Sequence, residues 1–234
     1  MEIGRAVIFD LGDTLVEYEG IPLSWSEHYQ DALKSLAEYL EAAPSKSQYK
    51  SASEVLSRFN TRKNPRENEF SFSEILDEVC RSLGASGQDA GCVLGAARAF
   101  FKVFRQRLSC FPEVHGCLTR LKKSGASIGV FTDVPYGMPR ELVMEDIQYS
   151  GLSELVDVVL TSGDCGWRKP SKVTLESICE ELGYMCRDAI YVGNERKDIE
   201  VALKSGCGSV LIDRAGSGAD YGQDLTLPDL SELA

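Results

Sequence analysis

The stretch Ala6-Val7-Ile8-Phe9-Asp10-Leu11-Gly12-Asp13-Thr14-Leu15 decides how the rest of the chain is interpreted. Its first four residues are apolar and predict a β-strand that is buried on both faces. Asp10 stands where this strand ends, and a turn is expected over residues 12–14. Ligands of open parallel sheets bind just outside the carboxyl ends of the strands. We therefore expect Asp10 to be a site residue, because a carboxylate is costly to bury there unless a cationic group meets it.

The composition is that of a globular protein, with 43% hydrophobic and 26% charged residues among 234. This length suits one large domain or a core with an insertion. The net charge of −11 argues against binding to nucleic acid or to an anionic membrane, but a divalent cation could still admit a phosphorylated substrate. Neither an apolar run long enough to span a bilayer nor a signal-peptide pattern is found, so a cytoplasmic protein is expected.

Eight cysteines are spread along the chain, and none of them forms a C-x-x-C pair. Most lie within helical or strand patterns, so we expect reduced and mostly structural thiols, as in a cytosolic protein. His28 and His115 are the only histidines, and neither has the spacing of a metal ligand. A zinc site is therefore not expected.

A helical pattern follows the first strand and continues for about ninety residues. Apolar residues recur at helical spacing over Trp25–Leu40 and from about Asp89 to Leu108. Three S-x-x-E sequences predict helix starts, at Ser24, Ser51 and Ser71. Because no strand pattern interrupts this block, we expect residues 18–108 to form an all-helical insertion. Its basic loop at 61–66 is interpreted as solvated rather than as a binding element.

From Phe111 onward, strand and helix patterns alternate. Strands are predicted at Ile128–Phe131, Val156–Leu160, Ala189–Val192 and Ser209–Ile212, with an edge strand near Leu225–Leu227. Helices are predicted at Val114–Ser124, about Arg140–Ser150, Ser171–Leu182 and Asp198–Ser205. Such alternation requires right-handed crossovers and a parallel sheet. We therefore predict an α/β protein with a doubly wound parallel sheet, built from residues 1–17 and 109–234.

Polar residues that follow the predicted strands should meet at one edge of this sheet. Asp10, Thr132 and Asn194 each follow a strand end, with Asp198 four residues beyond Asn194. Lys169 lies in the loop after the strand that ends at residue 160. Hard oxygen ligands suit Mg²⁺, and an ammonium and a hydroxyl suit phosphoryl oxygens. An aspartate nucleophile would split a displacement at phosphorus into two easier steps.

Taken in order, these segments resemble the four motifs of the haloacid dehalogenase-like (HAD) hydrolase superfamily, in its C1-capped branch. The matching segments are Phe9–Leu15 for motif I, Val130–Asp133 for motif II, Gly166–Pro170 for motif III and Tyr191–Ile199 for motif IV. The return of the chain to the core at Phe111–Val114 also fits this family. The resemblance covers the whole predicted core and implies a Rossmann-like domain. Residues 18–108 match the family's cap domain only in position and helical character.

The resemblance also implies a role for each matching residue. Asp10 would be the nucleophile, and Thr132 and Lys169 would hold the transferring phosphoryl group. The Mg²⁺ ligands would be Asp10, the backbone carbonyl of Gly12, Asn194 and Asp198. The implied function is a Mg²⁺-dependent phosphatase that acts on a small phosphorylated metabolite through an aspartyl-phosphate intermediate.

Two positions depart from the family pattern. Motif I normally carries a second aspartate two residues after the nucleophile, as general acid and base. Here that position is Gly12, and the carboxylate comes one residue later, at Asp13. Motif IV normally continues with aspartate after its glycine, where this chain has Asn194. Because general acid–base help is worth about 10²–10⁴-fold, the glycine at position 12 leads us to expect a weak or specialised phosphatase. Because Asn194 is a neutral ligand in place of a charged one, we also expect weaker binding of Mg²⁺.

Three other interpretations remain open at this stage. Gly12 and Asn194 also fit a non-catalytic binding or regulatory protein that retains the HAD fold. A phosphonate-cleaving hydrolase also lacks the second motif I aspartate, but it would need a reactive cap lysine, and no motif singles one out. A 2-haloacid dehalogenase needs no metal and is disfavoured by the metal-type ligands of motif IV. The sequence indicates neither the substrate nor the oligomeric state.

Overall fold

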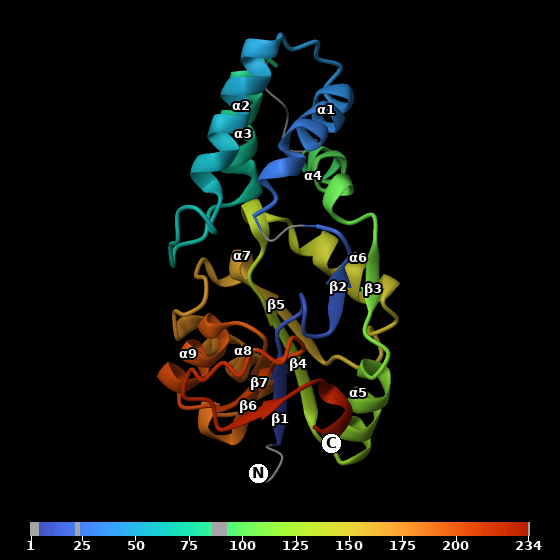
Figure 1. The fold of residues 1–234 in the computed structure, drawn as a ribbon, viewed down its shortest axis with the longest axis vertical. Helices are drawn as coiled ribbons and strands as arrows, with labels where there is room; N and C mark the ends of the chain where they lie inside the picture. Colours follow the sequence, from blue (N-terminus) through green and yellow to red (C-terminus); the bar gives the residue numbers. More distant parts are fainter. Residues whose placement is uncertain (1–4, 22–23, 86–92, 234) are drawn as a thin grey trace.

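The computed structural model describes residues 5–21, 24–85 and 93–233. Their largest element is a six-stranded parallel sheet in the order β5-β4-β1-β6-β7-β8 (Figure 1). The strands are β1 (Ala6–Phe9), β4 (Ser127–Thr132), β5 (Val158–Thr161), β6 (Ala189–Gly193), β7 (Gly208–Ile212) and β8 (Leu225–Leu227). All four residues of β1 are buried, as expected for a central strand that is covered on both faces.

Helices cover both faces of this sheet. On one face, α5 (Val114–Lys123) contacts β4 and α6 (Arg140–Tyr149) contacts β5. On the other face, α8 (Val173–Leu182) contacts β4 and β5, and α9 (Arg196–Ser205) contacts β6 and β7. A single turn, α7 (Ser162–Cys165), follows β5 directly. The prediction of an α/β fold with a doubly wound parallel sheet is confirmed.

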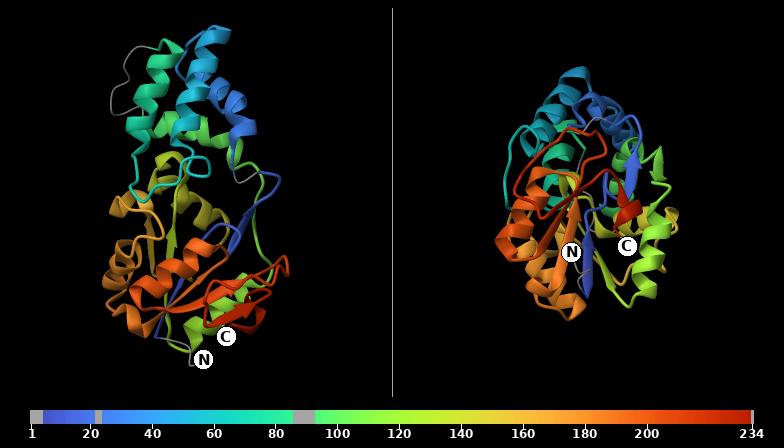
Figure 2. Two further views of the ribbon diagram at one scale, coloured as in Figure 1. Left: turned by 60° about the vertical axis from the view of Figure 1, so that its left-hand side comes forward. Right: turned by 60° about the horizontal axis from the view of Figure 1, so that its bottom comes forward.

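The helical insertion stands beyond the carboxyl edge of the sheet, at the top of Figure 1. Its helices are α1 (Tyr29–Tyr39), α2 (Lys46–Phe59), α3 (Phe72–Leu83) and α4 (Val93–Phe101), with short 3-10 turns η1 (Ser26–His28) and η3 (Lys102–Phe104). An antiparallel pair, β2 (Val16–Tyr18) and β3 (Leu108–Cys110), carries the chain out to these helices and back. The same arrangement is visible from the side in Figure 2. The predicted domain limits, after residues 17 and 108, fall inside this pair of strands.

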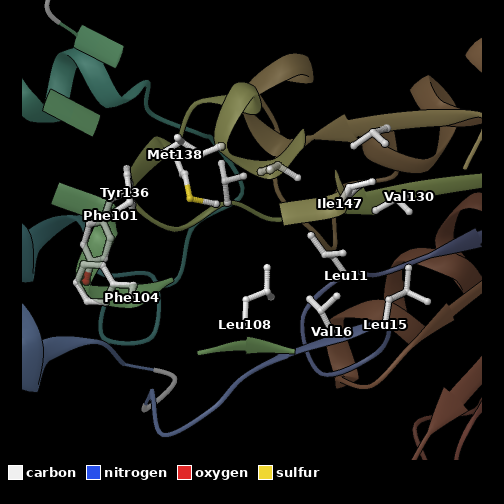
Figure 3. Packing of buried hydrophobic residues seen from close by; sticks show 14 of the residues in the cluster. Leu11, Leu15, Val16, Phe101, Phe104, Leu108, Val130, Tyr136, Met138 and Ile147 are labelled. Carbon is white, nitrogen blue, oxygen red and sulfur yellow. The ribbon is translucent and has the colours of Figure 1, made fainter. Parts of the chain in front are cut away.

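Aromatic packing joins the insertion to the loop that follows β4. Trp25 stacks on Phe104 with 4.1 Å between ring centroids; Phe104 is buried in the main hydrophobic cluster, and the partly buried Trp25 packs against it. Figure 3 shows Phe101 and Phe104 beside Tyr136 and Met138 of the loop after β4. This packing holds the insertion directly over the end of the strand that carries Thr132.

Only one of the three predicted S-x-x-E helix starts is confirmed, the one at Ser71. The start predicted at Ser24 is wrong, because Trp25 adopts a left-handed conformation with φ 55° and the α-helix begins at Tyr29. The start predicted at Ser51 is also wrong, because that residue lies inside α2. That helix begins after Ser45, whose side chain and backbone exchange hydrogen bonds with a glutamine three residues on, as in a capping box.

The last predicted helix of the insertion is shorter than expected. The α-helical part ends at Phe101, and Leu108 begins the strand β3 instead of ending the helix. The predicted start near Asp89 lies outside the described residues. Within the described part of the chain, none of the helices is both long and apolar enough to cross a membrane. The seven described cysteines are free thiols, and Cys92 lies outside the described residues.

Candidate active site

The first strand places Asp10 at the wall of a cavity. Its backbone N–H donates to the carbonyl of Val192 at 2.8 Å, which extends the pairing of β1 with β6 by one residue. Its side chain faces a cavity of about 170 Å³ whose lining comes from both the sheet edge and the insertion. The next residues turn tightly, with Asp13 at φ 57° and Leu15 N–H donating to Leu11 O at 2.9 Å. The turn after β1 therefore borders this cavity, with Gly12 and Asp13 in its lining.

Lys169 is the cationic partner that the buried carboxylate requires. Its ammonium donates to Asp10 Oδ1 at 2.8 Å and to Asp198 Oδ1 at 2.6 Å. A third hydrogen bond, 2.9 Å long, goes to the Tyr191 hydroxyl, which in turn donates to the Phe131 carbonyl at 3.1 Å. The lysine side chain is completely buried, and all three of its donors are used. Its charge is thereby fixed in position beside Asp10.

The charges of this group depend strongly on burial. Desolvation raises the pKa of Asp10 to about 6, although the neighbouring Lys169 acts in the opposite direction. Burial tends to lower the pKa of Lys169, but Asp10 and Asp198 together hold it well above its ordinary value. The lysine is therefore charged at neutral pH. Among the described residues, Asp10 Oδ2 has no hydrogen-bond partner, so this oxygen is available to a ligand.

Asp198 lies behind the cavity wall and organises the start of α9. Its Oδ2 accepts backbone hydrogen bonds from Asn194 at 3.1 Å and from Glu195 at 2.8 Å. The close approach of this side chain requires Gly193, because a Cβ on that residue would lie 2.5 Å from the Asp198 Cβ. Asn194 Oδ1 accepts a hydrogen bond from the Thr14 hydroxyl at 3.2 Å, which links motif IV to motif I.

Asp133 ties three of the motif segments together. Its Oδ1 accepts from the backbone N–H of Lys169 at 3.0 Å, and its Oδ2 accepts from Lys197 Nζ at 3.0 Å. Burial acts to raise the pKa of Asp133, but Lys197 and Arg168 lower it to about 2. The carboxylate is therefore ionised throughout the physiological range. It fixes the loop that carries Lys169 against the end of β4, where Thr132 also lines the cavity.

The insertion contributes charged groups to the same cavity. Arg62 lines it and forms an ion pair with Glu195, whose other carboxylate oxygen lies 3.3 Å from Lys197. Most of the 61–66 loop, Arg62 included, is exposed, as expected, although Arg62 also pairs with Glu195 and the Arg66 side chain is largely buried beside Glu69. Farther along, Glu69 pairs with Arg168 and donates its backbone N–H to Gly166 O at 3.0 Å. These contacts seat the insertion on the loop that carries Lys169.

The structure brings the expected site residues together in two layers. Asp10, Gly12 and Thr132 line the cavity, whereas Lys169 and Asp198 lie directly behind Asp10. Carboxylate, carboxamide and backbone carbonyl oxygens are the ligands that Mg²⁺ prefers, so Asp10, the Gly12 carbonyl and Asn194 fit this ion chemically. Both oxygens of Asp198 already accept hydrogen bonds, so this residue positions its neighbours in the present structure.

Several residues complete the site through contacts that the sequence does not indicate. Tyr191 lies within an apolar strand pattern, and its hydroxyl reaches Lys169 only because β6 lies beside β1. Asp133 and Gly193 lie within the motif segments, yet nothing in the pattern indicates the contacts they make. Arg62 belongs to the basic loop that the sequence does show, but its pairing with Glu195 has no local signal.

Comparisons with known proteins agree with this geometry. The family model described as haloacid dehalogenase-like hydrolase matches residues 7–212. Two similar curated proteins are phosphoglycolate phosphatases, from Yersinia pestis (29% identical over 108 residues, 46% of this chain and 45% of the relative) and from Salmonella choleraesuis strain SC-B67 (28% over 132 residues, 56% and 50%). The matches thus span about half the length of these curated relatives.

Solved structures with the same fold are similar over nearly their whole length. A 2-haloacid dehalogenase from Pseudomonas syringae pv. Tomato DC3000 has a TM-score of 0.68 and 24% identity, covering 99% of this chain and 96% of that one. A HAD phosphatase from Thermococcus onnurineus has a TM-score of 0.66 and 21% identity, covering 97% and 95%. At these identities the likeness shows the fold and leaves the reaction to be decided from the site.

Proposed function

Because the chain belongs to the haloacid dehalogenase-like hydrolase family, we propose that it is a Mg²⁺-dependent phosphatase that forms an aspartyl-phosphate on Asp10. The observation that carries this proposal is the buried Lys169 ammonium held between Asp10 and Asp198 at the wall of a small cavity. The ammonium binds Oδ1 of Asp10, and Oδ2 has no hydrogen-bond partner among the described residues, so Oδ2 can attack a substrate. Such a carboxylate is a suitable nucleophile for phosphoryl transfer.

The chemistry follows from the two oxygens of Asp10. Oδ1 stays bound to Lys169, and Oδ2 attacks phosphorus while the bond from phosphorus to the leaving oxygen breaks. The Thr132 hydroxyl, on the same cavity wall, can donate to a phosphoryl oxygen. Water then attacks phosphorus, which releases inorganic phosphate and restores the carboxylate. Asp10, the Gly12 carbonyl and Asn194 would hold Mg²⁺, which would offset the negative charge of the phosphate beside the Asp10 carboxylate.

The leaving oxygen needs a proton, and Asp13 is the motif I carboxyl in a position to supply one. It lines the same cavity as Asp10, although its backbone follows a left-handed turn. Burial raises the pKa of Asp13, and the negative charges of Glu195 and Glu17 raise it further. A raised pKa favours the protonated form that a general acid needs. We propose that Asp13 partly replaces the aspartate that is absent at Gly12.

The cavity favours a small, anionic substrate. Its volume of about 170 Å³ is small for a ligand pocket and suits a compact compound. Arg62, Arg105 and Arg168 place three guanidinium groups in the lining, of which Arg105 is bound to Asp146 at 2.8 Å and Arg168 is paired with Glu69. Arg62 is paired with Glu195, but its side chain is 40% exposed, so it has the most freedom to contact a substrate group remote from the phosphate. The names of the curated relatives make phosphoglycolate the first compound to test.

A panel of small phosphate monoesters, including phosphoglycolate, tests this proposal by release of inorganic phosphate with millimolar Mg²⁺. We expect turnover of at least one compound, and its loss both in Asp10→Asn and after removal of Mg²⁺ by a chelator. Phosphonates and 2-haloacids are run beside the panel, the latter with chelator and detection of halide. Halide release without metal would instead establish the dehalogenase alternative. No product from any compound would favour the non-catalytic interpretation based on Gly12 and Asn194.

A further inference from the structure

Three cysteine thiols meet at the edge of the sheet opposite the candidate active site. Cys179 lies near the end of α8, and Cys186 lies in the 3-10 turn η5 (Cys186–Asp188) that precedes β6. Cys207 comes between α9 and β7. The three sulfur atoms all lie within 4.8 Å of one another. Within the described ranges, no other group of three histidine, cysteine or acidic side chains brings its ligand atoms together in this way.

The surroundings of these thiols are apolar. Cys179 and Cys207 are buried in the hydrophobic cluster between the sheet and helices α8 and α9, together with Leu175 and Ile178. Cys186 is partly buried at the margin of the same cluster, so the sulfur group can be reached from solvent on that side. Unpaired thiolates would be strongly disfavoured in such an environment. A bound cation would reduce this penalty by offsetting part of their charge and by bonding directly to the sulfurs.

We propose that Cys179, Cys186 and Cys207 form a binding site for a soft, thiophilic cation, and that Cu(I) fits it best. Thiolates are the ligands that select Cu(I), whereas structural zinc sites nearly always have four ligands. The two histidines of the chain do not supply a fourth. His28 is in the helical insertion, and His115 on α5 lies 2.9 Å from the Ser150 carbonyl on the other face of the sheet.

The geometry needs only a small adjustment. Metal–sulfur bonds of about 2.3 Å in a trigonal arrangement place the sulfur atoms about 4 Å apart. Sulfurs that already lie within 4.8 Å of one another therefore need to close by less than about 1 Å. Three metal–sulfur bonds would form, three thiol protons would be released, and the metal would not change oxidation state. The bound ion would join α8 to the segments that lead into β6 and β7.

The test uses the reduced full-length chain, titrated with Cu(I) under anaerobic conditions against a coloured Cu(I) chelator. We expect the chain to withdraw one tightly held equivalent, and Cys179→Ser, Cys186→Ser and Cys207→Ser each to lose it. Cys110→Ser, which changes another partly buried thiol outside the cluster, should retain it. Retention of the equivalent by all three cluster variants would overturn the site. A parallel titration in which Zn²⁺ binds there and Cu(I) does not would overturn the choice of cation.

A second measurement covers the case in which a serine variant does not fold. In the native chain, bound Cu(I) should protect Cys186 from a thiol-alkylating reagent, as read by peptide mass spectrometry. Cys110 should be alkylated equally with and without the metal. Equal labelling of Cys186 in both conditions would contradict the proposal. Because the cluster lies away from the cavity, this result is independent of whether the chain is a phosphatase.

Discussion

Replacing Gly12 with aspartate restores the carboxylate that motif I normally carries, and we expect the Gly12→Asp variant to be a faster phosphatase. A Cβ at this position would meet no atom within 4 Å, so the side chain enters open space. The backbone at Gly12 does not adopt the positive φ that would strain a substituted residue. The variant should therefore fold as the parent does, and a change in rate can be attributed to chemistry.

The size of the effect follows from what a general acid contributes. A positioned carboxyl accelerates proton transfer by about 10²–10⁴-fold, equivalent to lowering the barrier by roughly 3–5 kcal/mol. Asp13 already lines the cavity with a raised pKa, so part of this contribution is already present. We therefore expect a gain near the lower end, about 10²-fold in kcat for an alkyl phosphate. The gain should be smaller for an aryl phosphate, whose leaving oxygen needs less protonation.

The assay compares kcat for one alkyl and one aryl phosphate in the parent, Gly12→Asp and Gly12→Asn. The asparagine variant is the matched control, because it adds a side chain of the same shape without an acidic proton. Asp13→Asn, made in both backgrounds, shows how much of the role Asp13 already fills. An equal gain in Gly12→Asp and Gly12→Asn, or no gain on the alkyl phosphate, would refute the reasoning that the missing acid limits the rate.

Three further predictions concern metal binding and stability. Mg²⁺ at ten times its dissociation constant should raise the free energy of unfolding by about 1.4 kcal/mol, and by much less in Asp10→Asn; an equal rise in both would place the ion elsewhere. Gly193→Ala should lower the free energy of unfolding, measured with urea, by about 1–3 kcal/mol, because its Cβ would lie 2.5 Å from Asp198. An unchanged midpoint would contradict this close contact. Asp133, whose pKa is lowered to about 2, stabilises the fold by about 2 kcal/mol above pH 4 and loses this contribution as the pH falls toward 2. The difference in free energy of unfolding between the parent and Asp133→Asn should therefore become smaller as the pH falls from 4 to 2. A difference that stays constant over this interval would argue against an ionised Asp133.

The sheet could be predicted from the sequence because its central strands are short, continuous apolar runs. The run Ala6–Phe9 is buried on both faces, and each crossover helix ends in a recognisable way, as at Gly183 and Gly206. The convergence of Asp10 and Thr132 on one cavity followed from the same pattern, since both stand at strand ends. What could not be predicted were elements too short to show a period, such as the three-residue strands β2 and β3.

The remaining features depend on contacts between distant parts of the chain. Tyr191 reaches Lys169 across 22 positions, and Arg62 reaches Glu195 across 133. The sulfur cluster is of the same kind, because Cys179 and Cys207 meet only when α8 and α9 pack on one face of the sheet. Such neighbours are set by tertiary packing, and periodicity or local motif spacing carries no information about them.

The central claim is that Asp10 is a nucleophile that accepts a phosphoryl group. Beryllium trifluoride imitates a phosphoryl group on an aspartate, so its binding can be followed by ¹⁹F NMR with and without Mg²⁺. The account predicts bound fluorine resonances in the parent chain that require Mg²⁺ and are absent from Asp10→Asn. Resonances that persist in Asp10→Asn, or none in the parent chain at millimolar Mg²⁺, would contradict it.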